Sequence, residues 1–206
     1  MERKSHWQNI YHTKDSKQVS WYTPHLAESL RLILSLNLSK EDPMIDVGSG
    51  ASTLVDDLLK EGFNHITVLD ISSQALEVAK KRLGEKAQKV KWVISDITTA
   101  ALPKTYYTLW HDRAVFHFLT KEEDRQKYKE HLRQSLKPGG YFIVSTFSPE
   151  GPPQCSGLEV QRYSPDTLGS ELGKDFLLMK SFKESHHTPF QTVQDFTYCL
   201  FRKFSS

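Results

Sequence analysis

The sequence is poor in cysteine, in long apolar runs and in excess charge of either sign. Its 206 residues include two cysteines, Cys155 and Cys199, which are far apart and outside any C-x-x-C spacing. This pattern favours neither a zinc site nor a disulfide framework. No apolar run is long enough for a membrane span, and Met1 to His6 lead into no signal-peptide core. Lys and Arg number 27 against 25 Asp and Glu, too balanced for a nucleic-acid surface. We therefore expect a cytoplasmic protein with reduced thiols and no bound metal, membrane or nucleic acid.

Apolar runs of strand length alternate with helical patterns through most of the chain. A helix is expected from Thr23 and Pro24, and another after a Thr120/Glu123 capping box. Strands are expected at about 44–47, 65–69, 90–95, 106–111 and, after a Pro-Gly-Gly turn, 141–147. Strict alternation of this kind predicts a parallel sheet built from βαβ units.

The last forty residues have a different pattern. A short helix from Ser164-Pro165 is followed by strand-like runs at 176–182 and 193–204, with no room for a helix between them. These two strands are expected to pair as an antiparallel hairpin at one edge of the sheet. Because no linker or repeat divides the sequence, we expect a single domain over residues 1–206.

The most informative motif is Asp46-Val47-Gly48-Ser49-Gly50, followed by Asp70 at the end of the next apolar run. The glycines permit close approach of the backbone to a ligand, and a carboxylate at position 70 suits ribose hydroxyls. This pattern predicts an adenosine-cofactor site. Thr53 occupies the place of the third glycine of a dinucleotide fingerprint, which disfavours a nicotinamide-dependent dehydrogenase.

The acid-x-G-x-G spacing resembles the first motif of the class I S-adenosylmethionine-dependent methyltransferases. Leu136-Lys137-Pro138-Gly139-Gly140 resembles that family's L-x-P-G-G turn, and Asp112-Arg113 through Leu119 resembles a segment of the thiopurine methyltransferase group. A similar Asp-Lys/Arg segment occurs in the methyltransferase-like family that modifies protein lysines. The resemblance implies an α/β, Rossmann-like, doubly wound seven-stranded sheet of order 3-2-1-4-5-7-6, with the last strand antiparallel.

The resemblance also implies where S-adenosyl-L-methionine would lie, with S-adenosyl-L-homocysteine as the product. Asp46, Gly48, Ser49 and Gly50 would meet the methionine half, and Asp70, solvated in the absence of ligand, would hold the ribose. Ile71 would lie on the adenine face, and Asp96 with Ile97 would contact the adenine edge. Ile71 as an ordinary core residue, and Asp96 as a turn residue, are the alternatives.

Residues 1–40 form an N-terminal arm rich in aromatic side chains. Trp7, Tyr11 and Trp21 are predicted to form a lid around the sulfonium, where cation–π attraction and exclusion of water would help. Simple packing of the arm on the edge of the sheet is the alternative.

His111, Asp112 and His117, at or after the end of the fourth expected strand, are candidates for catalysis, and His111 is also a candidate for cofactor binding. Each also has a structural alternative: a packed histidine, or for Asp112 a pair with Arg113 or a cap of the following helix. The expected acceptor is a nucleophilic N, S or O on a small molecule or a protein side chain. A protein that binds the cofactor without catalysis is the competing interpretation.

Overall fold

The fold is a seven-stranded sheet with helices on both faces, and the computed structural model describes residues 3–204. The strands of the sheet are β1 (Met44–Val47), β2 (Ile66–Asp70), β3 (Val90–Ile94), β4 (Tyr107–Arg113), β5 (Leu136–Phe147), β8 (Phe176–His187) and β9 (Val193–Lys203). The helices are α1 (Arg3–Thr13), α2 (Ala27–Ser35), α3 (Leu54–Lys60), α4 (Ser73–Leu83), α5 (Glu122–Ser135) and α6 (Pro165–Leu172). The remaining elements within residues 3–204 are two short 3-10 helices, η1 (Gly84–Lys89) and η2 (Phe116–Phe118), and a small hairpin formed by β6 (Gln154–Cys155) and β7 (Leu158–Glu159).

The strand order is β3-β2-β1-β4-β5-β9-β8. β9 runs antiparallel to both of its neighbours, and the other neighbouring strands are parallel. The predicted fold class and strand order are therefore confirmed, including the antiparallel hairpin at the carboxyl end of the chain.

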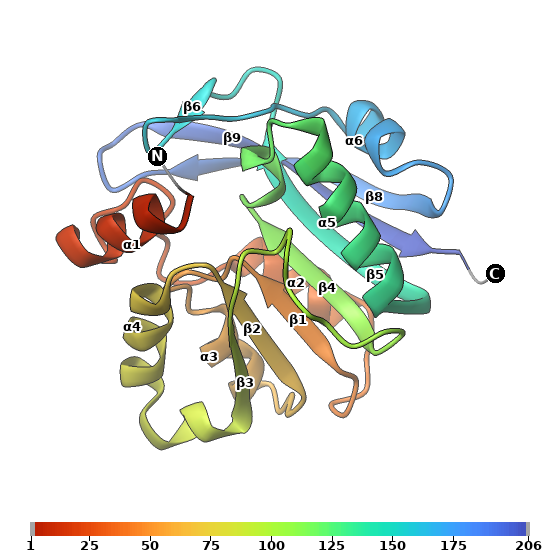
Figure 1. Ribbon diagram of the computed structural model, residues 1–206, viewed down its shortest axis with the longest axis horizontal. Coiled ribbons are helices and arrows are strands. Elements are labelled where there is room, and N and C mark those ends of the chain that lie inside the picture. Colours follow the sequence, from red (N-terminus) through yellow and green to blue (C-terminus); the bar gives the residue numbers. More distant parts are fainter. Residues whose placement is uncertain (1–2, 205–206) are drawn as a thin grey trace.

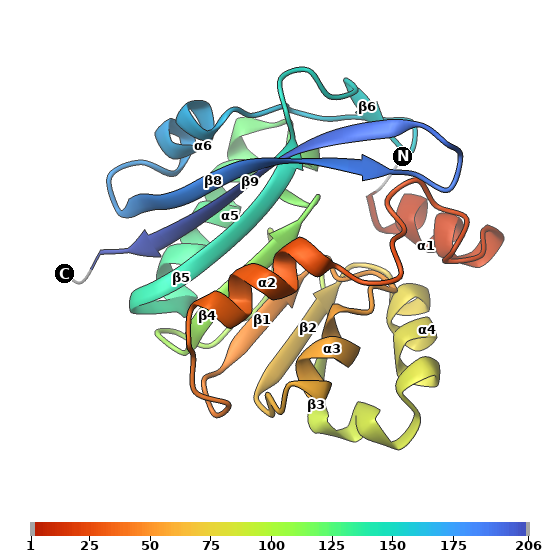
Figure 2. The same ribbon diagram turned by 180° about the vertical axis from the view of Figure 1, so that it is seen from behind.

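Two apolar cores lie on opposite faces of the sheet. One packs α2, α3 and α4 against alternate residues of the strands, and the other packs α5 and α6 against the remaining residues (Figures 1 and 2). The central strand β1 is buried at all four of its residues, as expected for a strand covered on both faces. Side chains that follow one another on a strand therefore enter different cores.

Several predicted element boundaries were wrong for local reasons. α2 begins at Ala27 because the Thr23 hydroxyl donates to the His25 carbonyl at 3.0 Å instead of capping a helix. α5 has Lys121 at its N-cap without a side-chain cap, so the Thr120 capping box does not form. β5 already pairs with β4 at Leu136, before the predicted turn.

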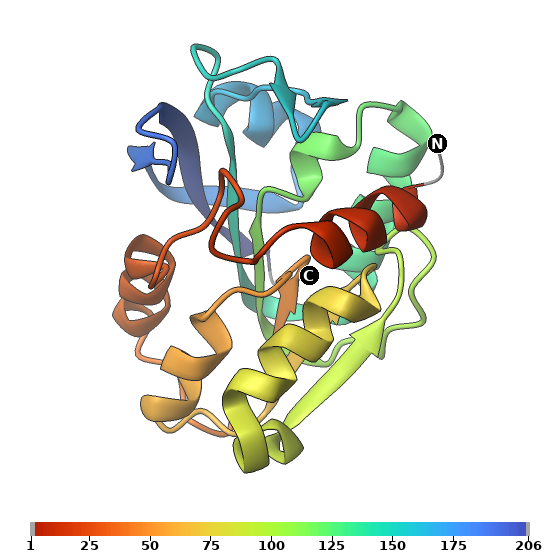
Figure 3. The ribbon, with the colours of Figure 1, turned by 90° about the vertical axis from the view of Figure 1, so that its left-hand side faces the viewer.

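The carboxyl ends of β1, β2, β3 and β4 meet at one rim of the molecule. α1 crosses this rim beside α4, as the side view in Figure 3 shows. The chain has thus placed its first helix over the region where ligands bind in open parallel sheets. None of the helices within residues 3–204 is long and apolar enough to span a bilayer.

Candidate functional site

The turn after β1 depends on two glycines with left-handed backbone. Gly48 and Gly50 have φ of +65° and +57°, a region that side chains disfavour. A Cβ on Gly48 would lie 1.8 Å from Cγ2 of Val115, and a Cβ on Gly50 would lie 2.2 Å from the hydroxyl of Tyr11. In this structure the space beside each glycine, where a Cβ would lie, is filled by a side chain of this protein. The sequence had instead suggested that a ligand would occupy that space.

Asp70 ends β2 with its carboxylate buried under this turn. Its Oδ2 accepts a hydrogen bond from the Gly50 N–H at 2.8 Å, and its Oδ1 accepts one from the Ser72 N–H at 2.8 Å. Burial, reinforced by the nearby charge of Asp46, raises the pKa of Asp70 to about 6. The expectation of a solvated carboxylate was wrong, because Asp70 is only 6% exposed.

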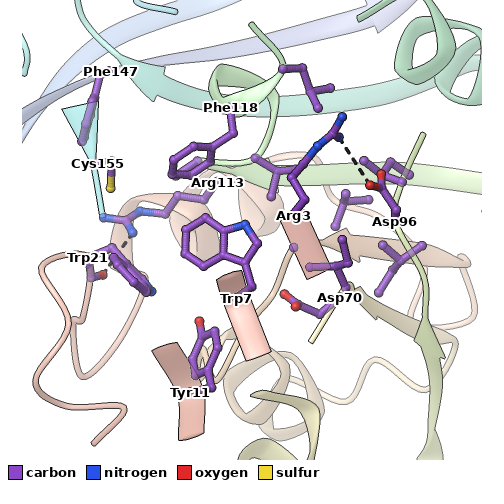
Figure 4. A pocket seen from close by; sticks show the side chains of 18 of the residues that line it. Arg3, Trp7, Tyr11, Trp21, Asp70, Asp96, Arg113, Phe118, Phe147 and Cys155 are labelled. Atoms are coloured by element: carbon purple, nitrogen blue, oxygen red, sulfur yellow. Dashed lines mark hydrogen bonds and ion pairs between the residues drawn. The ribbon is translucent and has the colours of Figure 1, made fainter. Parts of the chain in front are cut away.

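A cavity lies above the carboxyl ends of these strands (Figure 4). Eight of the residues predicted to bind a cofactor line it, and besides the three aromatic residues of the arm these are Gly48, Asp70, Ile71, Asp96 and Ile97. The last five lie at or next to the ends of strands. They come from the ends of β1, β2 and β3, which are distant in sequence and adjacent in the sheet. Topology has therefore brought together residues that the sequence analysis selected one at a time.

A second cavity adjoins the first at Gly48 and contains Asp46, Ser49 and His111. Asp46 Oδ2 and Ser49 Oγ are buried and have no hydrogen-bond partner among residues 3–204. Unpaired buried polar atoms are costly and call for an explanation such as a ligand. An acceptor oxygen and a hydroxyl in this position suit a cationic, hydrogen-bonding group.

The arm covers both cavities with aromatic side chains. Trp7, Tyr11 and Trp21 line the first cavity and pack edge to face, with ring centroids 5.8 Å apart for Trp7–Trp21 and 6.4 Å for Tyr11–Trp21. Arg3 holds the start of α1 in place through ion pairs with Asp96, at 3.4 Å, and with Asp124. The arm is thus fastened to a residue that also lines the cavity.

His111 is held in a buried chain of hydrogen bonds. Its Nδ1 lies 2.7 Å from Asp46 Oδ1, and its Nε2 lies 2.9 Å from the hydroxyl of Ser29. The Ser29 hydroxyl lies 3.2 Å from the hydroxyl of Tyr198. Both ring nitrogens of His111 are therefore hydrogen bonded, and this series of hydrogen bonds fixes the position of the Asp46 carboxylate.

Asp112 lies on the opposite face of β4 from His111. Its carboxylate accepts hydrogen bonds from the Val115 N–H at 2.9 Å, the Phe116 N–H at 3.2 Å and the Tyr128 hydroxyl at 2.6 Å. Burial raises its pKa to about 6. Among the described residues Asp112 lines neither cavity, so its geometry matches the structural alternative and not a base.

His117 is also fully buried outside both cavities. Its Nδ1 accepts a hydrogen bond from the Phe147 N–H at 3.2 Å. Burial, together with the charge of Arg113, lowers the pKa of His117 to about 3. A neutral histidine without access to the cavity does not fit the predicted general base.

The sequence analysis missed several residues that line the first cavity. Arg113, Phe147, Cys155, Gln194 and Phe196 form its far end, from β4, β5, β6 and β9. The signal for Arg113 was its position one residue after Asp112, because alternation along β4 places it on the face of His111. Gln194 had no comparable signal, since its place depends on the pairing of β9 with β5.

Comparison with known proteins supports the assignment of the fold. Residues 45–144 match a family model described as a methyltransferase domain. The chain is 26% identical over 123 residues to EEF1A lysine methyltransferase 2 of Danio rerio, which covers 57% of this chain and 53% of the relative. It is 28% identical over 124 residues to malonyl-[acyl-carrier protein] O-methyltransferase 1 of Ilyobacter polytropus, and this match covers 60% of this chain and 44% of the relative. The chain spans about half of the length of these relatives.

A solved structure shares the fold over almost the whole chain. The Burkholderia thailandensis 1,6-didemethyltoxoflavin-N1-methyltransferase, with S-adenosylhomocysteine bound, superposes with a TM-score of 0.71 at 18% identity and covers 98% of this chain and 87% of its own. Residues 45–144, just under half of the chain, thus match the methyltransferase domain family, and they contribute strands to the seven-stranded sheet described above. The solved structure that shares the fold holds S-adenosylhomocysteine.

Proposed function

We propose that this chain transfers a methyl group from S-adenosyl-L-methionine to a nucleophilic nitrogen, sulfur or oxygen of an acceptor. One observation supports this proposal above all others. Gly48, Asp70, Ile71, Asp96 and Ile97 surround one cavity at the carboxyl ends of the central strands. That rim is where open parallel sheets bind nucleotide-like ligands.

The polar atoms around the two cavities fit the parts of this cofactor. Each carboxylate oxygen of Asp70 accepts one backbone hydrogen bond and keeps a lone pair for a ribose hydroxyl. In the second cavity, Asp46 Oδ2 and Ser49 Oγ are the unpaired atoms that would meet the methionine ammonium group. Asp96 and Ile97 would meet the adenine edge, although the Asp96 carboxylate also faces Arg3.

When bound, the cofactor supplies a methyl group on a positively charged sulfur, which is activated for displacement. The contribution of the protein is then alignment of the acceptor and exclusion of water. Trp7, Tyr11 and Trp21 carry out that exclusion as a lid, and their ring faces attract a sulfonium. Within this proposal residues 1–206 act as one domain, with residues 1–40 as the lid.

We assign His111 as a positioning residue and not as a base. Both of its ring nitrogens are hydrogen bonded, and one of them holds the carboxylate of Asp46. Asp112 and His117 stabilise the segment after β4 through backbone contacts. The acceptor would therefore reach the site already in a nucleophilic form, since a base is needed only for a nucleophile that carries a proton.

Calorimetry with S-adenosylhomocysteine and with NAD tests the cofactor assignment. S-adenosylhomocysteine should bind and NAD should not, and Asp70→Ala should weaken the binding while Asp166→Asn, on the exposed start of α6, should not. Transfer of a tritiated methyl group to a lysate, separated into protein and small-molecule fractions, then identifies the acceptor class. Binding without transfer to either fraction would favour the non-catalytic interpretation.

A further inference from the structure

The first cavity extends beyond the residues assigned to the cofactor. At this far end Phe147, Cys155 and Arg113 face inward on the side away from Asp70 and Asp96 (Figure 4). Arg113 also lines the second cavity, so it stands between the two. Phe196 and Gln194 of β9 complete the wall. The far end is therefore mainly aromatic and apolar, with one guanidinium and one amide as its polar groups.

Arg113 is a buried cation with unused hydrogen-bond donors. Its side chain is 6% exposed, and Nε and Nη2 have no hydrogen-bond partner within residues 3–204. Nη1 donates to the Trp21 carbonyl at 3.2 Å, and the guanidinium lies 4.6 Å from the ring centre of Phe196. The nearest carboxylate oxygen, Glu184 Oε2, is 4.0 Å from Nη2, which is too far for a hydrogen bond.

The other charged groups of the cavity leave Arg113 as the cation available to a ligand. Arg3 is engaged by Asp96 and Asp124 at the cofactor end. Burial raises the pKa of the Cys155 thiol to about 11, so the thiol is neutral and does not repel an anion. Glu184 balances part of the charge of Arg113 from 4.0 Å, but Nε and Nη2 still lack hydrogen bonds within residues 3–204, and such buried donors are costly unless a ligand accepts from them.

Gln194 adds a second unsatisfied group to the lining of the same cavity. Its Oε1 is buried without a partner in the described chain, so it is free to accept a hydrogen bond from a ligand. Phe147 and Phe196 pack edge to face, with ring centroids 4.9 Å apart, and form one apolar wall of the cavity. A planar apolar body would lie against this wall, and an acidic group on that body would face the donors of Arg113. A lysine ammonium would meet a like charge in a poorly solvated wall.

We propose that the far end binds a compact acceptor with an aromatic or apolar body and an anionic group, which pairs with Arg113. This inference rests on the proposed methyl transfer and names its acceptor class. It selects a small acid over the ammonium of a protein lysine side chain. Arg113 and Gln194 are then residues that determine specificity for the acceptor.

Three probes with the same ring test the charge preference of the far end. Benzoate, benzamide and benzylamine are titrated by calorimetry into the protein saturated with S-adenosylhomocysteine. Benzoate should bind at least about 10-fold more tightly than benzamide, as expected for one charge-assisted contact, and benzylamine should bind most weakly. Arg113→Met should remove the preference for benzoate, and Arg113→Lys should restore part of it.

Arg202→Met provides the matched control, because Arg202 is exposed on β9 and its guanidinium lies over Tyr141. This variant should keep both the preference for benzoate and the affinity for S-adenosylhomocysteine. Equal binding of benzoate and benzamide, tighter binding of benzylamine, or no benzoate binding at roughly 10 mM would each overturn the inference.

The same titrations separate this inference from the proposed function. If S-adenosylhomocysteine itself does not bind, the proposed function fails. If it binds and Arg113→Met weakens it while the ranking of the probes stays the same, Arg113 serves the cofactor and the inference fails alone. The ranking of the three probes on the unaltered protein decides the question if Arg113→Met does not fold.

Discussion

Replacing Asp70 by alanine tests both the site and the energetics of its burial. The substitution removes the acceptor of two buried backbone N–H groups, from Gly50 and Ser72, each at 2.8 Å. An unsatisfied buried donor costs about 1–3 kcal/mol. The substitution also removes a carboxylate whose burial raises its pKa to about 6. These two effects act in opposite directions, and they separate with pH.

The sign follows from the two protonation states of Asp70. The folded protein holds the proton up to about pH 6, whereas the unfolded chain releases it near pH 4. Over that window the folded state binds more protons, so the free energy of unfolding falls as the pH rises. The fall attributable to Asp70 is roughly 3 kcal/mol for a shift of about two pKa units. In the Asp70→Ala variant, the free energy of unfolding should no longer show this fall between about pH 4 and pH 6.

The affinity for the cofactor should respond in the opposite way. Above pH 6 the ionised carboxylate accepts the ribose hydroxyls, and the variant should bind S-adenosylhomocysteine ~10–100-fold more weakly, through loss of two charge-assisted contacts. Below pH 6 the unaltered protein should itself bind more weakly. Urea denaturation and calorimetry at pH 5 and pH 8 measure both quantities. A folded Asp70→Ala protein with normal affinity for S-adenosylhomocysteine at pH 8 would refute the proposal that Asp70, at the end of β2, holds the ribose.

Three further substitutions and one truncation test other parts of the site. Gly48→Ala should reduce the yield of folded protein and abolish binding, because its Cβ would lie 1.8 Å from Val115. Gly50→Ala should fold, but its Cβ would displace the Tyr11 hydroxyl, so cleavage of the arm by protease should increase. Asp112→Asn should flatten the stability profile between about pH 4 and 6 without changing the affinity for S-adenosylhomocysteine, and an affinity loss above ~10-fold would contradict its structural role. Removal of residues 1–22 should leave a folded sheet that transfers no methyl group; undiminished turnover would identify the arm as packing alone.

The sequence predicted the sheet because each strand has a local signature. Met44 to Val47 form an apolar run that ends at a glycine turn, and the same logic locates the strands that follow. The hairpin of β8 and β9 was predictable because the segment between the two runs has no room for a helix. The boundaries at Thr23 and Thr120 were not predictable, because a threonine in a cap pattern does not have to cap: the Thr23 hydroxyl donates to the His25 carbonyl, and Lys121 takes the N-cap position of α5.

The cofactor half of the site was predictable for the same reason. Asp46 lies one residue before the end of β1, Asp70 ends β2, and Asp96 comes two residues after β3, and parallel strands end at one rim. The burial of Asp70 was not predictable, because it arises from the turn after β1 folding over β2, with the Gly50 N–H as the contact. That contact joins residues 20 positions apart and depends on the register of the two strands.

The acceptor half of the site shows why residue type alone does not identify the residue that contacts a substrate. His111, Asp112 and Arg113 are adjacent, and all three side chains are capable of proton transfer or charge pairing. Alternation along β4 sends Asp112 into the core with α5 and sends Arg113 to the cavity with His111. Since the neighbouring strands supply the partners, Asp46 engages the histidine while two nitrogens of the arginine remain unpaired. The residue available to a substrate is thus selected by what its neighbours leave unsatisfied.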